Sequence, residues 1–143
     1  MTLLFLMNSG SAALMKLLLD THAFLWLRSN PHKVPATVLT AYGNPENRIY
    51  LSLVSVWEMQ IKHQTGKLQL DLPLEELIRK QCDENMLEIL PITMNHIFRL
   101  ESLPSYHKDP FDRLLIVQTQ AEKLSLVSAD GIMSQYDVKL FWK

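Results

Sequence analysis

The chain has 143 residues, of which 48% are hydrophobic and 20% are charged, and its formal net charge is -1. This composition is typical of one globular domain with a real core and argues against a disordered chain. A net charge near zero excludes a general attraction to nucleic acid, so RNA or DNA would have to be held by a local patch or through a metal ion. The single cysteine, Cys82, cannot form an intramolecular disulfide, which predicts a reducing, cytoplasmic location. No apolar run reaches the length of a membrane span.

The first fourteen residues precede the first clear strand signal. An apolar run at 3–7 is followed by small residues at 9–13, without the basic start of a secretory signal. Because Met15 stands directly before the first predicted strand, we expect residues 1–14 to be an N-terminal extension outside the fold. Residues 15–143 are expected to form a single domain. An edge strand is the main alternative for the extension, and a secretory signal is the next.

Short apolar runs alternate with helical patterns along the rest of the chain. Strands are predicted at 17–19, 49–52, 87–90 and 125–128, with a fifth possible at 138–141. Helices are predicted at 23–28, 35–41, from Ser52 or Ser55 to about Thr65, and at 73–84, 93–103 and 110–123, with a brief turn or helix at 131–136. This alternation predicts right-handed βαβ units. The expected fold is therefore α/β and three-layered, with a parallel four- to five-stranded sheet flanked by helices.

Asp20 ends the first strand, an unbroken run of three leucines that is typical of a strand buried on both faces. In open α/β sheets, the carboxyl end of the strands is where ligands bind. The simple alternative is that Asp20, or Thr21 beside it, caps the following helix.

Glu58 lies inside a predicted helix, and its neighbours three and four residues away include Val54 and Ile61. These neighbours place Glu58 partly on the apolar face, which favours a semi-buried, functional glutamate. The alternative is an exposed pair with Lys62, one helical turn later, which would add only about 0.3–0.5 kcal/mol to stability.

Asp112 and Asp130 complete the set of candidate acids. Asp112 follows Asp109 and Pro110 at a helix start, where Asp109 is expected to be the cap and acids are stabilised by the helix dipole. A helix cap needs only one acid, so Asp109 and Asp112 together, followed by Arg113, favour a functional role for Asp112. Asp130 closes the fourth strand, and its alternative is a turn residue before Gly131.

The four acids carry more weight together than singly. Two close strands and two lie in early helical turns, and these positions share one edge of a parallel sheet. Four carboxylates gathered there repel one another and raise some of their pKa values unless a cation compensates. Mg²⁺ or Mn²⁺ suits ligands that are all oxygen, and such an ion supports phosphodiester hydrolysis.

The chain resembles the PIN-domain ribonucleases, and within them the VapC-like toxins of type II toxin–antitoxin systems. The resemblance is carried by LLLDTH at 17–22, SLVSVWE at 52–58 with Ile61 and Lys62 beyond it, HKDPFDRLLI at 107–116 and SAD at 128–130. These pieces occur in the family's order and span the chain from Met15 onward. Ser128 stands where threonine is common, and residues 1–14 have no counterpart.

The resemblance implies a PIN fold, metal-dependent cleavage of RNA, frequent homodimerisation and neutralisation by a small cognate antitoxin. It implies that Asp20, Glu58, Asp112 and Asp130 are the catalytic, metal-binding acids. Four further residues are candidates for the second shell or for substrate contact. Ser128 would orient a carboxylate or a water, Asp109 would be cap and second shell, and Arg113 and Lys62 would contact phosphate or form ion pairs.

Other side chains are weaker candidates. His22, His96 and His107 are too scattered to predict a zinc site, and a polar loop histidine is the simplest interpretation of His22 and His107. Trp26, Trp57 and Trp142 are expected to be core or dimer contacts rather than base-stacking platforms.

Two other functions compete with the nuclease. A phosphoacceptor switch domain also places an acid at a strand end, but it would need acidic partners near the first strand and a lysine closing a later one. No acid precedes Asp20, and no late strand ends in lysine. A non-catalytic α/β interaction module, in which the acids are only caps, is the remaining alternative.

Overall fold

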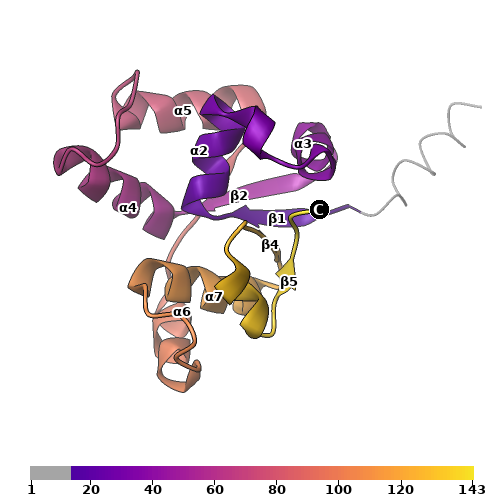
Figure 1. Cartoon of the computed structure of the whole chain (residues 1–143), viewed down its shortest axis with the longest axis vertical. Helices are drawn as coiled ribbons and strands as arrows, with labels where there is room; N and C mark the ends of the chain where they lie inside the picture. Colours follow the sequence, from indigo (N-terminus) through magenta and orange to yellow (C-terminus); the bar gives the residue numbers. More distant parts are fainter. Residues whose placement is uncertain (1–13) are drawn as a thin grey trace, which may run out of the picture.

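A computed structural model describes residues 14–143 (Figure 1). Of the expected N-terminal extension, residues 1–13 lie outside the described residues, and Leu14 is exposed. The described chain contains one sheet of five parallel strands in the order β3-β2-β1-β4-β5, so the predicted parallel α/β sheet is confirmed. The strands are β1 (Lys16–Leu19), β2 (Arg48–Ser52), β3 (Glu88–Leu90), β4 (Ser125–Val127) and β5 (Lys139–Leu140).

Helices connect the strands and cover both faces of the sheet. The α-helices are α2 (Thr21–Ser29), α3 (Ala36–Gly43), α4 (Leu53–Gln64), α5 (Leu74–Asn85), α6 (Met94–Arg99) and α7 (Pro110–Glu122). Three short 3₁₀ helices are η1 (Pro31–Lys33), η2 (Leu100–Ser102) and η3 (Gly131–Gln135). In Figure 1, α2, α3 and α5 lie on one side of the sheet and α6 and α7 on the other. No helix in the part of the chain that the structure describes is long and apolar enough to cross a membrane.

The three leucines of β1 place apolar side chains on both faces of the sheet, so both faces are buried. Side chains alternate along a strand. Leu17 and Leu19 therefore join the core beneath α2 to α5, while Leu18 joins the core beneath α7. All three leucines are fully buried. The unbroken apolar run was thus a correct signal of a central parallel strand.

Two sequence expectations differ from the structure. The helix predicted at 93–103 divides into α6 and the tighter 3₁₀ turn η2, and the Arg113 guanidinium donates hydrogen bonds to the carbonyls of Leu100 and Leu103 at this end. Trp57 is 59% exposed and stands edge-on to Phe111, with ring centroids 5.3 Å apart, which excludes a core position and leaves a dimer contact as the prediction for this residue.

Strand order places a crevice beside β1. The chain passes from β1 to β2 and β3 on one side, and β4 and β5 then pair on the other side. The order therefore reverses between β1 and β4, and in α/β sheets this switch point, at the carboxyl ends of the strands, is where ligands bind. The backbone N–H of Asp20 donates to the carbonyl of Val127 at 3.0 Å, which joins the two strand ends directly.

Candidate metal centre

Asp20 lies at the end of β1 and is both a helix cap and a buried carboxyl at the switch point. Its Oδ1 accepts a hydrogen bond from the backbone N–H of Ala23 at 2.7 Å, which confirms the predicted capping of α2. Only 5% of the residue is exposed. Burial raises the pKa of the Asp20 carboxyl, and the nearby charge of Asp130 raises it further, while a hydrogen bond from Ser128 acts in the opposite direction.

Ser128 links the ends of β1 and β4. Its hydroxyl is fully buried, accepts a hydrogen bond from the backbone N–H of Asp130 at 3.0 Å and bonds to the Asp20 side chain. Asp130 caps η3, because its Oδ1 accepts from the backbone N–H of Ile132 at 2.9 Å. The structure thus brings Asp20 and Asp130 together through one serine.

Asp109 and Asp112 lie at the amino end of α7. Asp109 caps this helix as predicted, with its Oδ1 accepting from the backbone N–H groups of Phe111 at 2.8 Å and Asp112 at 3.1 Å. The pKa of the Asp112 carboxyl is raised from 3.8 to about 7, mainly by burial and next by the charge of Asp109. The charges of Glu58 and Asp20 raise it further, and His107 lowers it. The acids therefore interact electrostatically across four elements of the fold.

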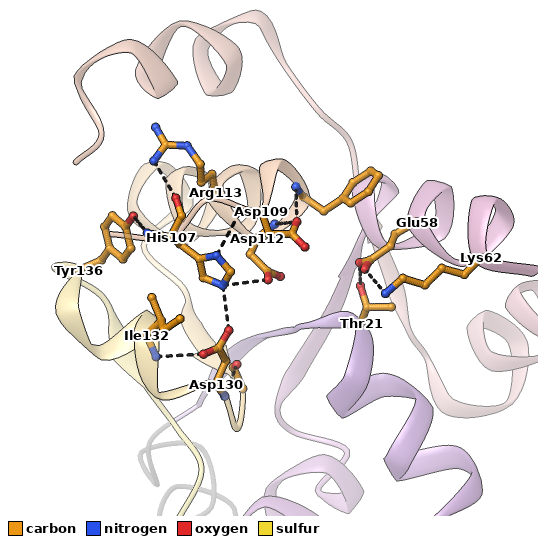
Figure 2. Close-up of polar contacts among 12 residues, drawn as sticks. Thr21, Glu58, Lys62, His107, Asp109, Asp112, Arg113, Asp130, Ile132 and Tyr136 are labelled. Carbon is orange, nitrogen blue, oxygen red and sulfur yellow. Dashed lines mark hydrogen bonds and ion pairs between the residues drawn. The ribbon is translucent and has the colours of Figure 1, made fainter. Parts of the chain in front are cut away.

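His107 lies between two of these acids (Figure 2). Its Nε2 is 2.8 Å from Asp130 Oδ2 and 3.0 Å from Asp112 Oδ2, and its side chain is only 11% exposed. His107 is therefore a polar loop histidine, as predicted, but a largely buried one with two acidic neighbours. Because His107 and Asp112 lie in one sequence motif, their contact had a weak signal in the sequence. The contact between His107 and Asp130 could not be predicted in this way, because only the fold brings their two loops together.

Glu58 is buried, as its apolar neighbours predict, but it lies apart from the group formed by His107, Asp112 and Asp130 (Figure 2). Its Oε1 accepts a hydrogen bond from the Thr21 hydroxyl at 2.7 Å, and its Oε2 pairs with Lys62 at 2.7 Å. The pair with Lys62 is thus formed, although with a buried glutamate rather than an exposed one. Sequence reasoning had considered Thr21 only as a helix cap.

Arg113 forms no ion pair with an acid of the described chain, so the expectation that it pairs with the acids is not supported. Its guanidinium donates instead to four backbone carbonyls of the segment before α7, those of Leu100, Leu103, Pro104 and His107, at 2.9–3.4 Å. The side chain therefore braces the loop that carries His107.

The donor set suits a hard divalent cation. Among the described residues, one oxygen each of Asp112 and Asp130 and a His107 nitrogen lie within 4.8 Å of one another, and Asp20 and Ser128 border the same point of the sheet. Carboxylate and hydroxyl oxygens are the ligands that Mg²⁺ and Mn²⁺ prefer. A hollow of about 330 Å³, lined by Asp20, His22, Trp26, Ala129 and Asp130, opens beside the acids. A larger hollow of about 780 Å³ lies at the opposite end of the sheet, and Asp137 is the only acid in its lining.

Comparison with known proteins identifies a family. The family model described as PIN domain matches residues 17–139. No curated protein matches the chain significantly.

Several solved structures of toxin–antitoxin complexes contain a chain with the same fold. A chain of VapBC2 from Rickettsia felis, bound to a DNA fragment from their promoter, has a TM-score of 0.69 and 17% identity, covering 90% of this chain and 100% of that one. A chain of DNA-bound VapBC from Salmonella typhimurium has a TM-score of 0.65 and 13% identity, covering 90% of this chain and 98% of that one. A chain of a toxin–antitoxin complex from Klebsiella pneumoniae has a TM-score of 0.61 and 17% identity, covering 87% of this chain and 94% of that one.

Proposed function

The chain belongs to the PIN domain family, and we propose that it is a metal-dependent endoribonuclease that hydrolyses phosphodiester bonds in RNA. In this proposal Asp20, Glu58, Asp112 and Asp130 hold Mg²⁺ or Mn²⁺. The ion, when bound, supplies activation of the attacking water and stabilisation of the charge that develops on the phosphate and leaving oxygens. The residues of the chain provide the fixed oxygen ligands, the burial and the alignment.

The convergence of Asp112 and Asp130 on His107 at the switch point is the observation that carries this proposal, and the charges of the acids support it. The charges of Asp109, Glu58 and Asp20 all raise the pKa of Asp112, and Asp130 raises that of Asp20. Such crowding of like charges at the switch point of the sheet destabilises the ionised site unless a cation is bound. Perturbed carboxyls of this kind are typical of functional sites.

Helix capping alone does not explain the set. Asp20, Asp109 and Asp130 each accept a hydrogen bond from a backbone N–H and are caps, which favours a non-catalytic module as the competing interpretation. Asp112 is different, because no backbone N–H of the described residues donates to its carboxylate, and its contact is His107. Asp112 is therefore the residue that separates the two interpretations.

The biological setting follows from the same family. We propose that the chain is the toxin of a VapC-like toxin–antitoxin pair in the cytoplasm, that it forms a homodimer, and that a small cognate antitoxin neutralises it. Toxin–antitoxin complexes that contain a chain of this fold support the antitoxin partner. With a net charge of -1, the protein would hold RNA by local contacts and through the ion.

Calorimetric titration with Mn²⁺ tests the metal site. We expect saturable binding to the chelator-treated wild-type protein and a large loss of affinity in Asp112→Asn, because this substitution removes a charged ligand and leaves the caps intact. Asp83→Asn, an exposed aspartate of α5, is the matched control and should bind as wild type does. Absence of saturable binding to the wild-type protein would contradict the proposal and favour the non-catalytic module.

A further inference from the structure

His107 is fixed more firmly than a loop side chain usually is. Its carbonyl accepts from the Arg113 guanidinium at 3.3 Å, and its backbone N–H donates to the Tyr136 hydroxyl at 2.7 Å. The same tyrosine donates to the carbonyl of Pro104 at 2.7 Å. Side chains from α7 and from the end of η3 therefore hold the loop from both sides (Figure 2).

The hydrogen bonds of the imidazole define which nitrogen carries the proton. The backbone N–H of Asp109 donates to His107 Nδ1 at 3.2 Å, so Nδ1 acts as an acceptor and carries no proton. The ring proton must then lie on Nε2, which faces Asp112 Oδ2 and Asp130 Oδ2. The Nε2–H group hydrogen-bonds to Asp130 Oδ2, and Asp112 Oδ2 lies 3.0 Å from the same nitrogen, so carboxylates from the start of η3 and from α7 meet at one imidazole.

This arrangement separates two roles for His107. A nitrogen that binds a metal ion uses its lone pair, but Nε2 has none available while Nδ1 accepts a hydrogen bond. A donor that fixes the orientation of ligating carboxylates needs an N–H group, which His107 has. Outer contacts of this kind commonly determine how well metal ligands are arranged.

We propose that His107 is a positioning residue, whose Nε2–H fixes Asp130 by a hydrogen bond and sets the spacing between Asp130 and the adjacent Asp112 that a divalent cation needs, without itself binding the ion. This inference rests on the proposed function. Asp112 Oδ1, for which no hydrogen bond is formed within the described chain, stays available to the ion while Oδ2 lies 3.0 Å from Nε2. The hydrogen bonds from Arg113 and to Tyr136 fix the backbone from which the imidazole projects.

Mn²⁺ titration of two variants tests the proposal at about pH 8, above the Asp112 pKa of about 7. His107→Leu keeps the bulk of the side chain but removes the donor, and we expect its dissociation constant to rise by roughly 10- to 100-fold. His107→Gln places an amide N–H near the position of Nε2 and should recover most of the affinity. His32→Leu removes an exposed imidazole of η1 outside the hollow beside the acids and should stay within about twofold of wild type, because exposed charges are screened by salt.

Electron spin-echo spectroscopy of the Mn²⁺-loaded wild-type protein distinguishes positioning from direct ligation. We expect no coupling to a directly bound histidine nitrogen. Such a coupling, or an affinity of folded His107→Leu equal to wild type, would overturn the inference while leaving the metal site in place. Absence of Mn²⁺ binding to the wild-type protein would instead overturn the proposed function, and this inference with it.

Discussion

At Asp112, burial and the neighbouring charge of Asp109 raise the pKa of the carboxyl from 3.8 to about 7. A group whose pKa is higher in the folded state favours folding while it is protonated, and this contribution is lost as the pH rises through the folded value. The ionised Asp112 therefore destabilises the fold most above about pH 7. A shift of this size corresponds to a few kcal/mol, about 4 at most.

Asp112→Asn is expected to raise the melting temperature in the presence of a chelator at about pH 8, because the neutral amide removes the unfavourable charge. For a domain of this size the increase should be about 4–10 °C. It should shrink towards zero as the pH is lowered to about 4, where the wild-type carboxyl is protonated too. Thermal melts at both pH values measure this, with Asp83→Asn as the control. A lower melting temperature for Asp112→Asn at the higher pH would contradict the expected crowding of charge.

Arg113→Lys tests whether the arginine braces the loop or contacts RNA. Lysine keeps the charge but cannot reproduce the planar fork that reaches four carbonyls. We expect a loss of about 1–3 kcal/mol in stability, measured by urea unfolding. The exposed ion pair of Arg79 with Glu75 provides the control, and Arg79→Lys should be nearly neutral. Unchanged stability together with slower RNA cleavage would favour a phosphate contact for Arg113.

At the scale of elements, the sequence was most informative where the chain is regular. The apolar runs located all five strands, and Asp20, Ser52, Asp109 and Gly66 marked helix boundaries through cap and turn chemistry that acts over a few residues. The end of α5 at Asn85 lies one residue beyond the predicted end, but the left-handed residue after it was not predicted, because Met86 adopts a φ of 55°, which methionine seldom does.

Met86→Gly is therefore expected to stabilise the protein. Glycine adopts the left-handed region without the steric penalty of a Cβ atom, a penalty of about 1 kcal/mol, and Met86 is 73% exposed, so little packing is lost. Met94, at the start of α6, is similarly exposed at 69%, but it is helical, so Met94→Gly should destabilise by about 0.5–1 kcal/mol. Urea unfolding of both variants provides the comparison. A destabilised Met86→Gly would show that the side chain contributes more than its exposure indicates.

At the scale of the whole molecule, the candidate acids could be selected from the sequence because Asp20 and Asp130 follow strands and Asp112 opens a helix, while Glu58 lies partly on the apolar face of α4. The side chains that contact these acids could not be predicted from the sequence. His107 meets Asp130 across 23 residues, and Thr21 meets Glu58 across 37 residues, through the packing of loops and helices that no local pattern encodes. The carbonyl partners of Arg113 could not be predicted either, because they depend on how the loop before α7 folds.

Cleavage of a single-stranded RNA by folded wild-type and Asp112→Asn proteins, in Mn²⁺ and in chelator, tests most directly whether these acids form a hydrolytic metal site. We expect the wild-type protein to cleave in Mn²⁺ and to stop in chelator. Asp112→Asn should be at least about 100-fold slower, because one charged ligand of the ion is missing. Cleavage by folded Asp112→Asn at the wild-type rate, or by the wild-type protein in chelator, would contradict a metal-dependent mechanism at this site.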